Sequence, residues 1–186
     1  MSRSRHWFVR PPGAWRSSTG GASAIEFALL APILVLALAA TLDFGLVVHI
    51  RLSLNQAVSA SANYAMVNGA DVPTNALALA DSLGAIVPSG NDVTIVVNNG
   101  PTLRRVAGVV TRSGSQPAAS ACYCPRFDSN ALAWGSQTTC GDACAAGGTA
   151  GQYVVVTAAE TYSSMFSGYG VVENGAISVR SIIRVK

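Results

Sequence analysis

Hydrophobic and polar positions divide this chain of 186 residues into a strongly apolar N-terminal segment and a mixed C-terminal part. Phe27–Leu42 is sixteen residues long and carries no charge, and after Asp43 the apolar character resumes as far as Ile50. Phe27–Ile50 is therefore 24 residues long, whereas about 20 mostly apolar residues are enough to cross ~30 Å of hydrocarbon. We predict one transmembrane helix over residues 22–50.

The same helix is predicted to continue beyond the membrane. After the apolar segment, further apolar residues recur at three- and four-residue steps, as on one face of an amphipathic helix: Leu54, Ala57, Val58, Ala62, Ala65 and Met66. Asn68-Gly69 then supplies a helix stop. A continuous helix over Glu26–Val67 would place its first half in lipid and pack its second half on a folded domain. A second, short helix is expected over residues 73–83, ended by Gly84.

Four segments that are rich in β-branched or alternating apolar residues predict strands, at residues 92–97, 103–111, 151–161 and 176–186. In the last of them, polar side chains alternate with apolar ones, as in a half-buried strand: Ile177, Val179, Ile183 and Val185. Arg104 and Arg105 are expected on or near the solvent face of the second. Two helices followed by four strands indicate an α+β fold. The expected architecture is a long N-terminal membrane-spanning helix that continues into a small domain of one short helix and an antiparallel sheet of about four strands.

All four cysteines lie in one loop rich in Gly, Ala and Ser, predicted at residues 113–150, as Cys122-x-Cys124 and Cys140-x₃-Cys144. Cysteines that are exported to an oxidising compartment form disulfides. Two bridges that run between the pairs are therefore expected, with the connectivity left open. Zinc is an alternative, although neither pair has the common C-x₂-C spacing and no histidine lies nearby in the sequence. Free or redox-active thiols are a third interpretation.

The charges are unevenly distributed along the chain. Residues 22–186 hold eight basic and nine acidic side chains, whereas four arginines and no acid lie before residue 20: Arg3, Arg5, Arg10 and Arg16. By the positive-inside rule, this asymmetry places the N-terminus in the cytoplasm. The expected parts are a basic leader at 1–21, the transmembrane helix at 22–50, and an exported domain at 51–186 on the periplasmic side of the cytoplasmic (inner) membrane. The near-neutral folded part argues against nucleic-acid binding.

Other interpretations of the N-terminal segment are a cleaved secretory signal and an uncleaved signal anchor. Ala37-Leu38-Ala39 is similar to a signal-peptidase site, but cleavage there would leave an apolar stub over residues 43–50. Pro32 removes one backbone hydrogen bond in the middle of the segment, and we interpret it as a helix kink or as a mechanical element. Asp43 is expected to be a solvated acid at the outer membrane interface.

The junction between leader and helix carries the motif that points to a function. Gly20-Gly21-Ala22-Ser23-Ala24-Ile25-Glu26-Phe27 resembles the type IV prepilin processing signal, a glycine with glutamate at the fifth position after it. On this pattern Gly21 ends the leader, Ala22 becomes the new N-terminus and Glu26 is the fifth mature residue. Glycine suits the cut, because it lets an extended backbone enter a protease site without obstruction by a side chain.

Residues 20–65 resemble the TadE-like proteins of tight-adherence (Tad/Flp) pilus systems. The matching positions include an A-x-E-F start, a proline within the apolar run, an acid-Phe-Gly group and an alanine-rich helix: Glu26, Phe27, Pro32, Asp43, Phe44, Gly45 and Asn55–Ala65. The resemblance implies a minor pilin or pseudopilin that a prepilin peptidase cuts and that acts in Tad-type (type IVc) pilus assembly and adhesion. The partners it implies are the lipid bilayer, the prepilin peptidase, other pilins or pseudopilins and the pilus assembly platform.

The sequence contains no motif for catalysis, a cofactor or a metal, and we expect neither an enzyme nor a small-molecule substrate. His6 lies in the leader and His49 at the outer membrane edge, and P-loop, dinucleotide and nucleophile-elbow motifs are missing. Two further function classes stay open. One is an uncleaved, signal-anchored extracytoplasmic binding module outside any filament, and the other is a thiol-redox protein that uses Cys122-x-Cys124. We interpret three aromatic residues as a contact loop or as core packing: Tyr162, Phe166 and Tyr169.

Overall fold

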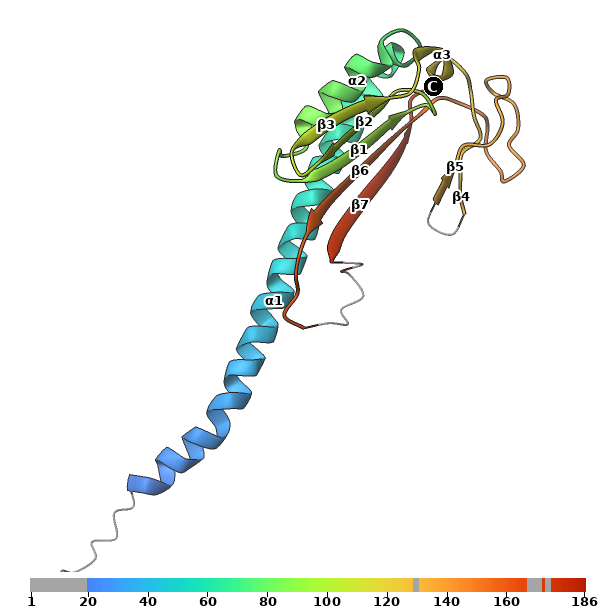
Figure 1. Cartoon of the computed structure of the whole chain (residues 1–186). Helices are drawn as coiled ribbons and strands as arrows, with labels where there is room; N and C mark the ends of the chain where they lie inside the picture. Colours follow the sequence, from blue (N-terminus) through green and yellow to red (C-terminus); the bar gives the residue numbers. More distant parts are fainter. Residues whose placement is uncertain (1–19, 129–130, 167–171, 173–174) are drawn as a thin grey trace, which may run out of the picture. The chain divides into compact units, whose positions relative to one another are not determined.

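A computed structural model describes residues 20–128, 131–166, 172 and 175–186 of the chain. The leader arginines, His6 and Tyr169 therefore lie outside the described residues. The chain divides into two compact units, Met1–Ala39 and Ala40–Lys186. Helix α1 (Gly20–Val67) begins in the first unit and ends in the second (Figure 1).

Helix α1 ends at Val67, the residue predicted from the sequence. The amide and the side-chain nitrogen of Asn68 donate hydrogen bonds to the Tyr64 carbonyl, at 3.0 and 2.9 Å, so the last turn is capped. A Cβ at Gly69 would lie 2.6 Å from Cβ of Val185, and a larger residue would therefore displace the end of the chain. The Asn-Gly pair acts as a helix stop because Asn68 caps the last turn and Gly69 lets the next residues pass close to Val185.

The second helix, α2 (Val72–Ile86), follows a short 3₁₀ turn, η1 (Gly69–Asp71). The predicted stop at Gly84 is wrong, since α2 continues for two further residues. Gly84 is buried against strand β2 (Thr102–Val106), where an added Cβ would lie 3.0 Å from Cδ2 of Leu103. This glycine is needed for close packing between helix and strand, and it does not end the helix.

A five-stranded antiparallel sheet has the order β3-β2-β1-β6-β7. Its strands are β1 (Asp92–Val97), β2 (Thr102–Val106), β3 (Val109–Ser113), β6 (Tyr153–Thr161) and β7 (Ala176–Arg184). Strand β6 pairs with β1 and β7, so the chain's last two long strands extend the sheet built by its first three. The α+β fold with a long apolar helix, a short helix and an antiparallel sheet is confirmed.

The predicted strand at 103–111 is wrong in one respect, because these residues form the hairpin β2–β3. Val106 pairs with Val109, and the two residues between them have positive φ, at 48° for Ala107 and 79° for Gly108. Two positive φ values in a two-residue loop are characteristic of a type I′ turn. Only Gly108 announces such a turn in the sequence, and Ala107 does not.

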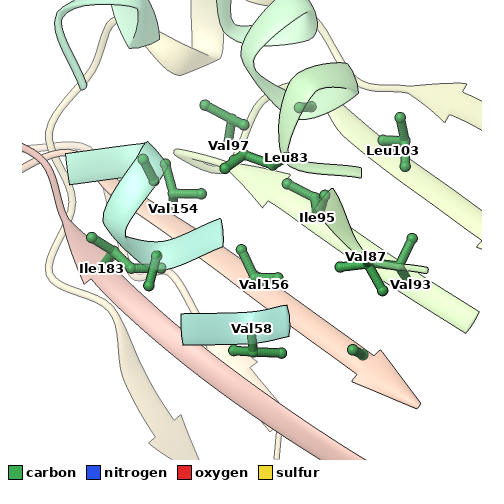
Figure 2. Packing of buried hydrophobic residues seen from close by; sticks show 14 of the residues in the cluster. Val58, Leu83, Val87, Val93, Ile95, Val97, Leu103, Val154, Val156 and Ile183 are labelled. Carbon is green, nitrogen blue, oxygen red and sulfur yellow. The ribbon is translucent and has the colours of Figure 1, made fainter. Parts of the chain in front are cut away.

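The hydrophobic core lies between one face of the sheet and the helices α1 and α2 (Figures 1 and 2). Figure 2 shows Val58 of α1 and Leu83 of α2 in the same cluster as Val156 of β6. In β7, Ile177 and Ile183 are buried, as the predicted alternation requires. Each such buried aliphatic side chain stabilises the fold by about 1.5–3 kcal/mol.

The segment predicted as a loop at 113–150 contains short regular elements: α3 (Gln116–Ala119), β4 (Arg126–Asp128) and β5 (Ala131–Ala133). Strands β4 and β5 pair with each other as a separate two-stranded sheet. We call residues 120–150 the cysteine lobe, of which 129–130 lie outside the described residues. The prediction of an extended loop is therefore wrong in detail, because two disulfides allow such short elements to persist.

Candidate functional site

The N-terminal part of α1 exposes apolar side chains almost continuously. Over Ser23–Val67, this helix is long and apolar enough to cross a membrane, and none of its most apolar window is buried. The exposed apolar residues from the start of the helix to the end of the first unit are Ile25, Phe27, Leu29, Leu30, Ile33, Leu34, Val35, Leu36 and Leu38. Such a surface is unfavourable in water and fits a single-pass membrane protein.

The proposed processing residues lie in the first two turns of this helix. The helix begins at Gly20, so the Gly21–Ala22 bond belongs to its first turn. Space is open around Gly21, where an added Cβ would have no atom within 4 Å. Glu26 is exposed, and within the described residues it has no hydrogen-bond or ion-pair partner. Its side chain therefore lies on the surface of the helix.

Three other residues of the predicted motif lie on the surface of α1. Pro32 is exposed within the helix. Phe44 is 52% exposed, and an added Cβ at Gly45 would meet no atom within 4 Å. These positions leave an apolar, partly small-residue surface on either side of a buried acid.

That acid, Asp43, is only 2% exposed, so the expectation of a solvated interfacial acid is wrong. The Tyr162 hydroxyl donates a hydrogen bond to its Oδ1 at 2.5 Å. The backbone N–H of Met165 donates to the same oxygen and the N–H of Phe166 to Oδ2, each at 3.2 Å. The acid of α1 thus holds the segment that follows β6, more than a hundred residues later in the chain.

The donors around Asp43 supply the hydrogen bonds that a buried carboxylate needs. A carboxylate removed from water is strongly unfavourable unless hydrogen-bond donors surround it. Here one hydroxyl and two consecutive backbone N–H groups converge on Asp43, as donors do in backbone anion sites. We call the segment from Tyr162 to Phe166 the Asp43-bound loop. Its residue Tyr162 also packs against the core, so core packing describes this aromatic residue, but its contact with Asp43 was missed.

The cysteine lobe is held by two disulfides, Cys122–Cys140 and Cys124–Cys144. Both run between the two pairs, in agreement with the sequence-based expectation, and the structure defines the connectivity. No free cysteine occurs among the described residues, which hold all four, so none of them is left as a zinc ligand or a free thiol. Two hydrogen bonds between the backbones of Tyr123 and Gly151, at 2.9 and 3.1 Å, link the lobe to the residues that precede β6. The Arg184 guanidinium of β7 also donates to the Thr149 hydroxyl of the lobe, at 2.7 Å.

An open recess of about 350 Å³ lies on this lobe. Its lining includes both cysteines of one disulfide, a single cation and one aromatic ring: Cys124, Arg126, Cys144 and Tyr153. Arg126 is exposed, so its charge is well solvated. Over the described ranges, no group of three or more His, Cys, Asp or Glu side chains lies close enough to hold a metal ion.

Two structural residues were also missed in the sequence. Arg105, expected near the solvent face, donates four hydrogen bonds to carbonyls around the end of α2: Gly84, Val87, Pro88 and Asn91, at 2.7–3.2 Å. Asn98, which directly follows β1, is fully buried and donates to the carbonyls of Ala119 and Ala121. Nothing local in the sequence announces either set of partners, because each partner lies on another element.

Comparison with known proteins gives one family match. The family model described as TadE-like protein matches residues 21–63 of this chain. No curated protein and no solved structure matches the chain. The matched range includes Gly21, Glu26 and Asp43, whereas the sheet and the cysteine lobe lie outside it. The resemblance that the sequence predicts is thus confirmed for residues 21–63, which are similar to the TadE-like family.

Proposed function

We propose that this chain is a minor pilin or pseudopilin that acts in the assembly of a Tad-type (type IVc) pilus and in adhesion. The observation that carries the proposal is the TadE-like match over residues 21–63, which begins at the proposed cleavage glycine. The exposed apolar surface of α1 supports anchoring in the cytoplasmic membrane. The arginine-rich leader favours a cytoplasmic N-terminus, and the two disulfides favour an exported domain.

In this proposal a prepilin peptidase cuts the chain between Gly21 and Ala22. The bond lies in the first turn of α1, so the helix must unwind locally before a protease can bind it in an extended form. Glycine lowers helix stability by about 1 kcal/mol per residue relative to alanine. Gly20 and Gly21 therefore weaken the helix at the bond that has to open, while the alanine- and leucine-rich residues that follow keep the rest helical.

Measurement of the intact mass of the membrane-bound chain tests this proposal. We expect loss of residues 1–21 in cells that contain the peptidase and a full-length chain in cells that lack it. Gly21→Val should block the cut, because a β-branched side chain resists the backbone conformations that glycine adopts. The matched control is Gly45→Val, which makes the same change in open space on the same helix. A full-length wild-type chain in the presence of the peptidase would contradict the proposal.

A second candidate function is supported by the recess on the cysteine lobe. In this alternative, the chain is an uncleaved, signal-anchored binding module whose lobe holds a partner outside the membrane and takes no part in a filament. The mass measurement separates the two candidates, because this second function requires an intact leader. A chain cut after Gly21 argues for the pilus function, and a full-length chain in the presence of the peptidase argues for the binding module.

A further inference from the structure

Two exposed apolar features lie close to Asp43: the surface of α1 around this residue, and a side chain of the Asp43-bound loop. Neither is accounted for by the proposed role in a pilus system. Within α1, Asp43 is almost fully buried while its neighbours Leu42, Phe44 and Leu46 are between 52% and 62% exposed. The Asp43-bound loop covers the acid and not these neighbours. Its own residue Met165 is 71% exposed, and the backbone of Met165 is fixed by the hydrogen bond to Oδ1. An apolar side chain is therefore held out from the domain beside an apolar helix surface.

The depth of Asp43 along the helix follows from where the next charges lie. After Asp43, the next ionisable side chains of α1 are His49 and Arg51, and both are exposed. Arg51 is eight residues further along, or about 12 Å at ~1.5 Å per residue. The polar interface on each side of a bilayer is only about 5–8 Å thick. If Arg51 lies at the outer edge of this interface, Asp43 lies about 4–7 Å inside the edge of the hydrocarbon.

Counting from the other end of the span gives the same result. About 20 residues are needed to cross the hydrocarbon, and twenty residues from Phe27 end at Leu46. Asp43 is three residues before that end. An acid at such a depth is unfavourable unless it is neutralised or hydrogen-bonded. In this chain, the donors of the Asp43-bound loop satisfy the acid from within the same molecule.

We propose that the Asp43-bound loop enters the polar interface on the outer side of the membrane that α1 spans, with the Met165 side chain in contact with lipid acyl chains. This inference rests on the proposed membrane anchoring of α1. The lipid bilayer is the partner that matches the surface, because the exposed side chains next to Asp43 are themselves apolar and belong to the helix that is proposed to span the membrane. Asp43 acts as a positioning residue, since it touches no lipid and fixes the backbone that presents Met165.

The depth of residue 165 can be measured with a spin label on the full-length chain in phosphatidylethanolamine–phosphatidylglycerol vesicles. All four native cysteines are in disulfides, so Met165→Cys supplies the single reactive thiol. The matched control is Ser113→Cys, at an exposed position at the end of β3. Through the pairing register, Ser113 lies level with Val155, six residues before the end of β6 and ~20 Å from it along the strand.

The readout is the ratio of label accessibility to oxygen, which concentrates in lipid, over accessibility to a water-soluble nickel chelate. We expect this ratio to be several-fold higher at residue 165 than at residue 113. Asp43→Asn in the Met165→Cys chain should lower the ratio toward the control value, because the amide replaces an acceptor that faces a backbone N–H with a donor. The same substitution should leave the label at residue 113 unchanged.

Three results would overturn the inference. A label at residue 165 that is as accessible to the chelate as the one at residue 113 excludes insertion. A label shielded from both reagents indicates contact with protein instead of lipid. An unchanged ratio in Asp43→Asn removes the positioning role of the acid. Retention of the chain by the vesicles under alkaline extraction is measured separately. A chain that is not retained contradicts the proposed anchoring itself, whereas a retained chain with an aqueous label contradicts only the contact proposed for the loop.

Discussion

The two acids on helix α1 have opposite environments, although both lie near the ends of one apolar segment. Asp43 is buried and its carboxylate accepts hydrogen bonds from Tyr162, Met165 and Phe166, whereas the Glu26 side chain is exposed and unpartnered within the described residues. A paired acid stabilises the domain that pairs it. An unpaired acid at a membrane edge gains most from a cation on another molecule. Substitutions at the two positions should therefore affect different properties.

For Asp43 we predict a loss of local stability. Asp43→Ala removes the carboxylate that accepts from the Tyr162 hydroxyl and leaves two backbone N–H groups without their acceptor, and each unsatisfied buried donor costs about 1–3 kcal/mol. Hydrogen exchange followed by mass spectrometry on the full chain in detergent should show the Met165 and Phe166 amides exchanging at least about tenfold faster. The matched control is Asp81→Ala. Asp81 forms a surface ion pair with Arg112 at 2.9 Å, and such pairs contribute about 0–1 kcal/mol. Equal protection in wild type and Asp43→Ala would contradict the prediction.

Arg105 provides a second prediction on single residues. Its guanidinium binds the carbonyls at the end of α2, where the last carbonyls of a helix lack intrahelical partners. Arg105→Met should lower the free energy of unfolding by about 2–4 kcal/mol, because charged hydrogen bonds are lost and carbonyls are left unsatisfied. Arg104→Met is the control, since Arg104 is an exposed neighbour on the same strand. Chemical denaturation monitored by circular dichroism would compare the two. A similar effect of both changes would show that Arg105 has no special role.

At the scale of helices and strands, the sequence predicted the elements whose signals lie in neighbouring residues. The apolar run, the three- and four-residue steps and Asn68-Gly69 were enough to place α1 and its last residue. Alternation of apolar and polar residues, although Ser181 and Ile182 interrupt it, was enough for β7, because one of its faces is buried. The hairpin β2–β3 was missed because valines lie on both sides of its turn and Ala107 carries no signal of positive φ. A glycine that is needed for close packing, such as Gly84, cannot be distinguished in the sequence from a glycine that ends a helix.

The candidate site divides in the same way. Gly21, Glu26 and the acid-Phe-Gly group follow one another on one helix, so their spacing could be recognised without a structure. The partners of Asp43 could not, because Tyr162 lies 119 residues away in sequence and only the packing of β6 along α1 brings them together. The disulfide connectivity likewise depends on the path of the cysteine lobe.

The β2–β3 turn yields a prediction of increased stability. Ala107 has φ of 48°, a left-handed conformation that costs an L-residue about 1–2 kcal/mol. Ala107→Asn creates the Asn-Gly pair that type I′ turns favour and should raise the free energy of unfolding by roughly 0.5–1 kcal/mol.

Gly108→Ala is the opposite test, because φ is 79° there and the surrounding space is open, so only strain changes. It should lower stability by a similar amount. Thermal unfolding of both variants checks the signs, and a lower midpoint for Ala107→Asn than for wild type would refute the assigned turn.

At the scale of the whole molecule, the cysteine lobe should depend on its bridges more than the sheet does. The two disulfides close loops of 18 and 20 residues in sequence separation, and each should stabilise the lobe by about 3 kcal/mol. Alkylation of the folded protein without reduction should add no label, and alkylation after reduction should label all four cysteines. Replacement of Cys124 and Cys144 together by alanine should open the lobe to proteases while the sheet keeps its circular dichroism. Labelling of all four cysteines on intact cells would contradict the prediction.

Assembly with other subunits is the property that we assign to Glu26. Cleavage after Gly21 would create an α-amine on Ala22, four residues before Glu26 and one helical turn from it. An amine of this chain or of a neighbouring one is then the natural partner for an acid that has none within the described residues.

Glu26→Gln keeps the size of the side chain and removes its charge. We expect this variant to be inserted and cut, yet to co-purify with pilin partners at least about tenfold less, the scale on which close charge pairs change affinity. Glu26→Asp keeps the charge and should retain part of the association. A Glu26→Gln chain that is processed and still joins its partners normally in cross-linking would leave Glu26 without a role in assembly, and one that stays uncut would restrict its role to the peptidase.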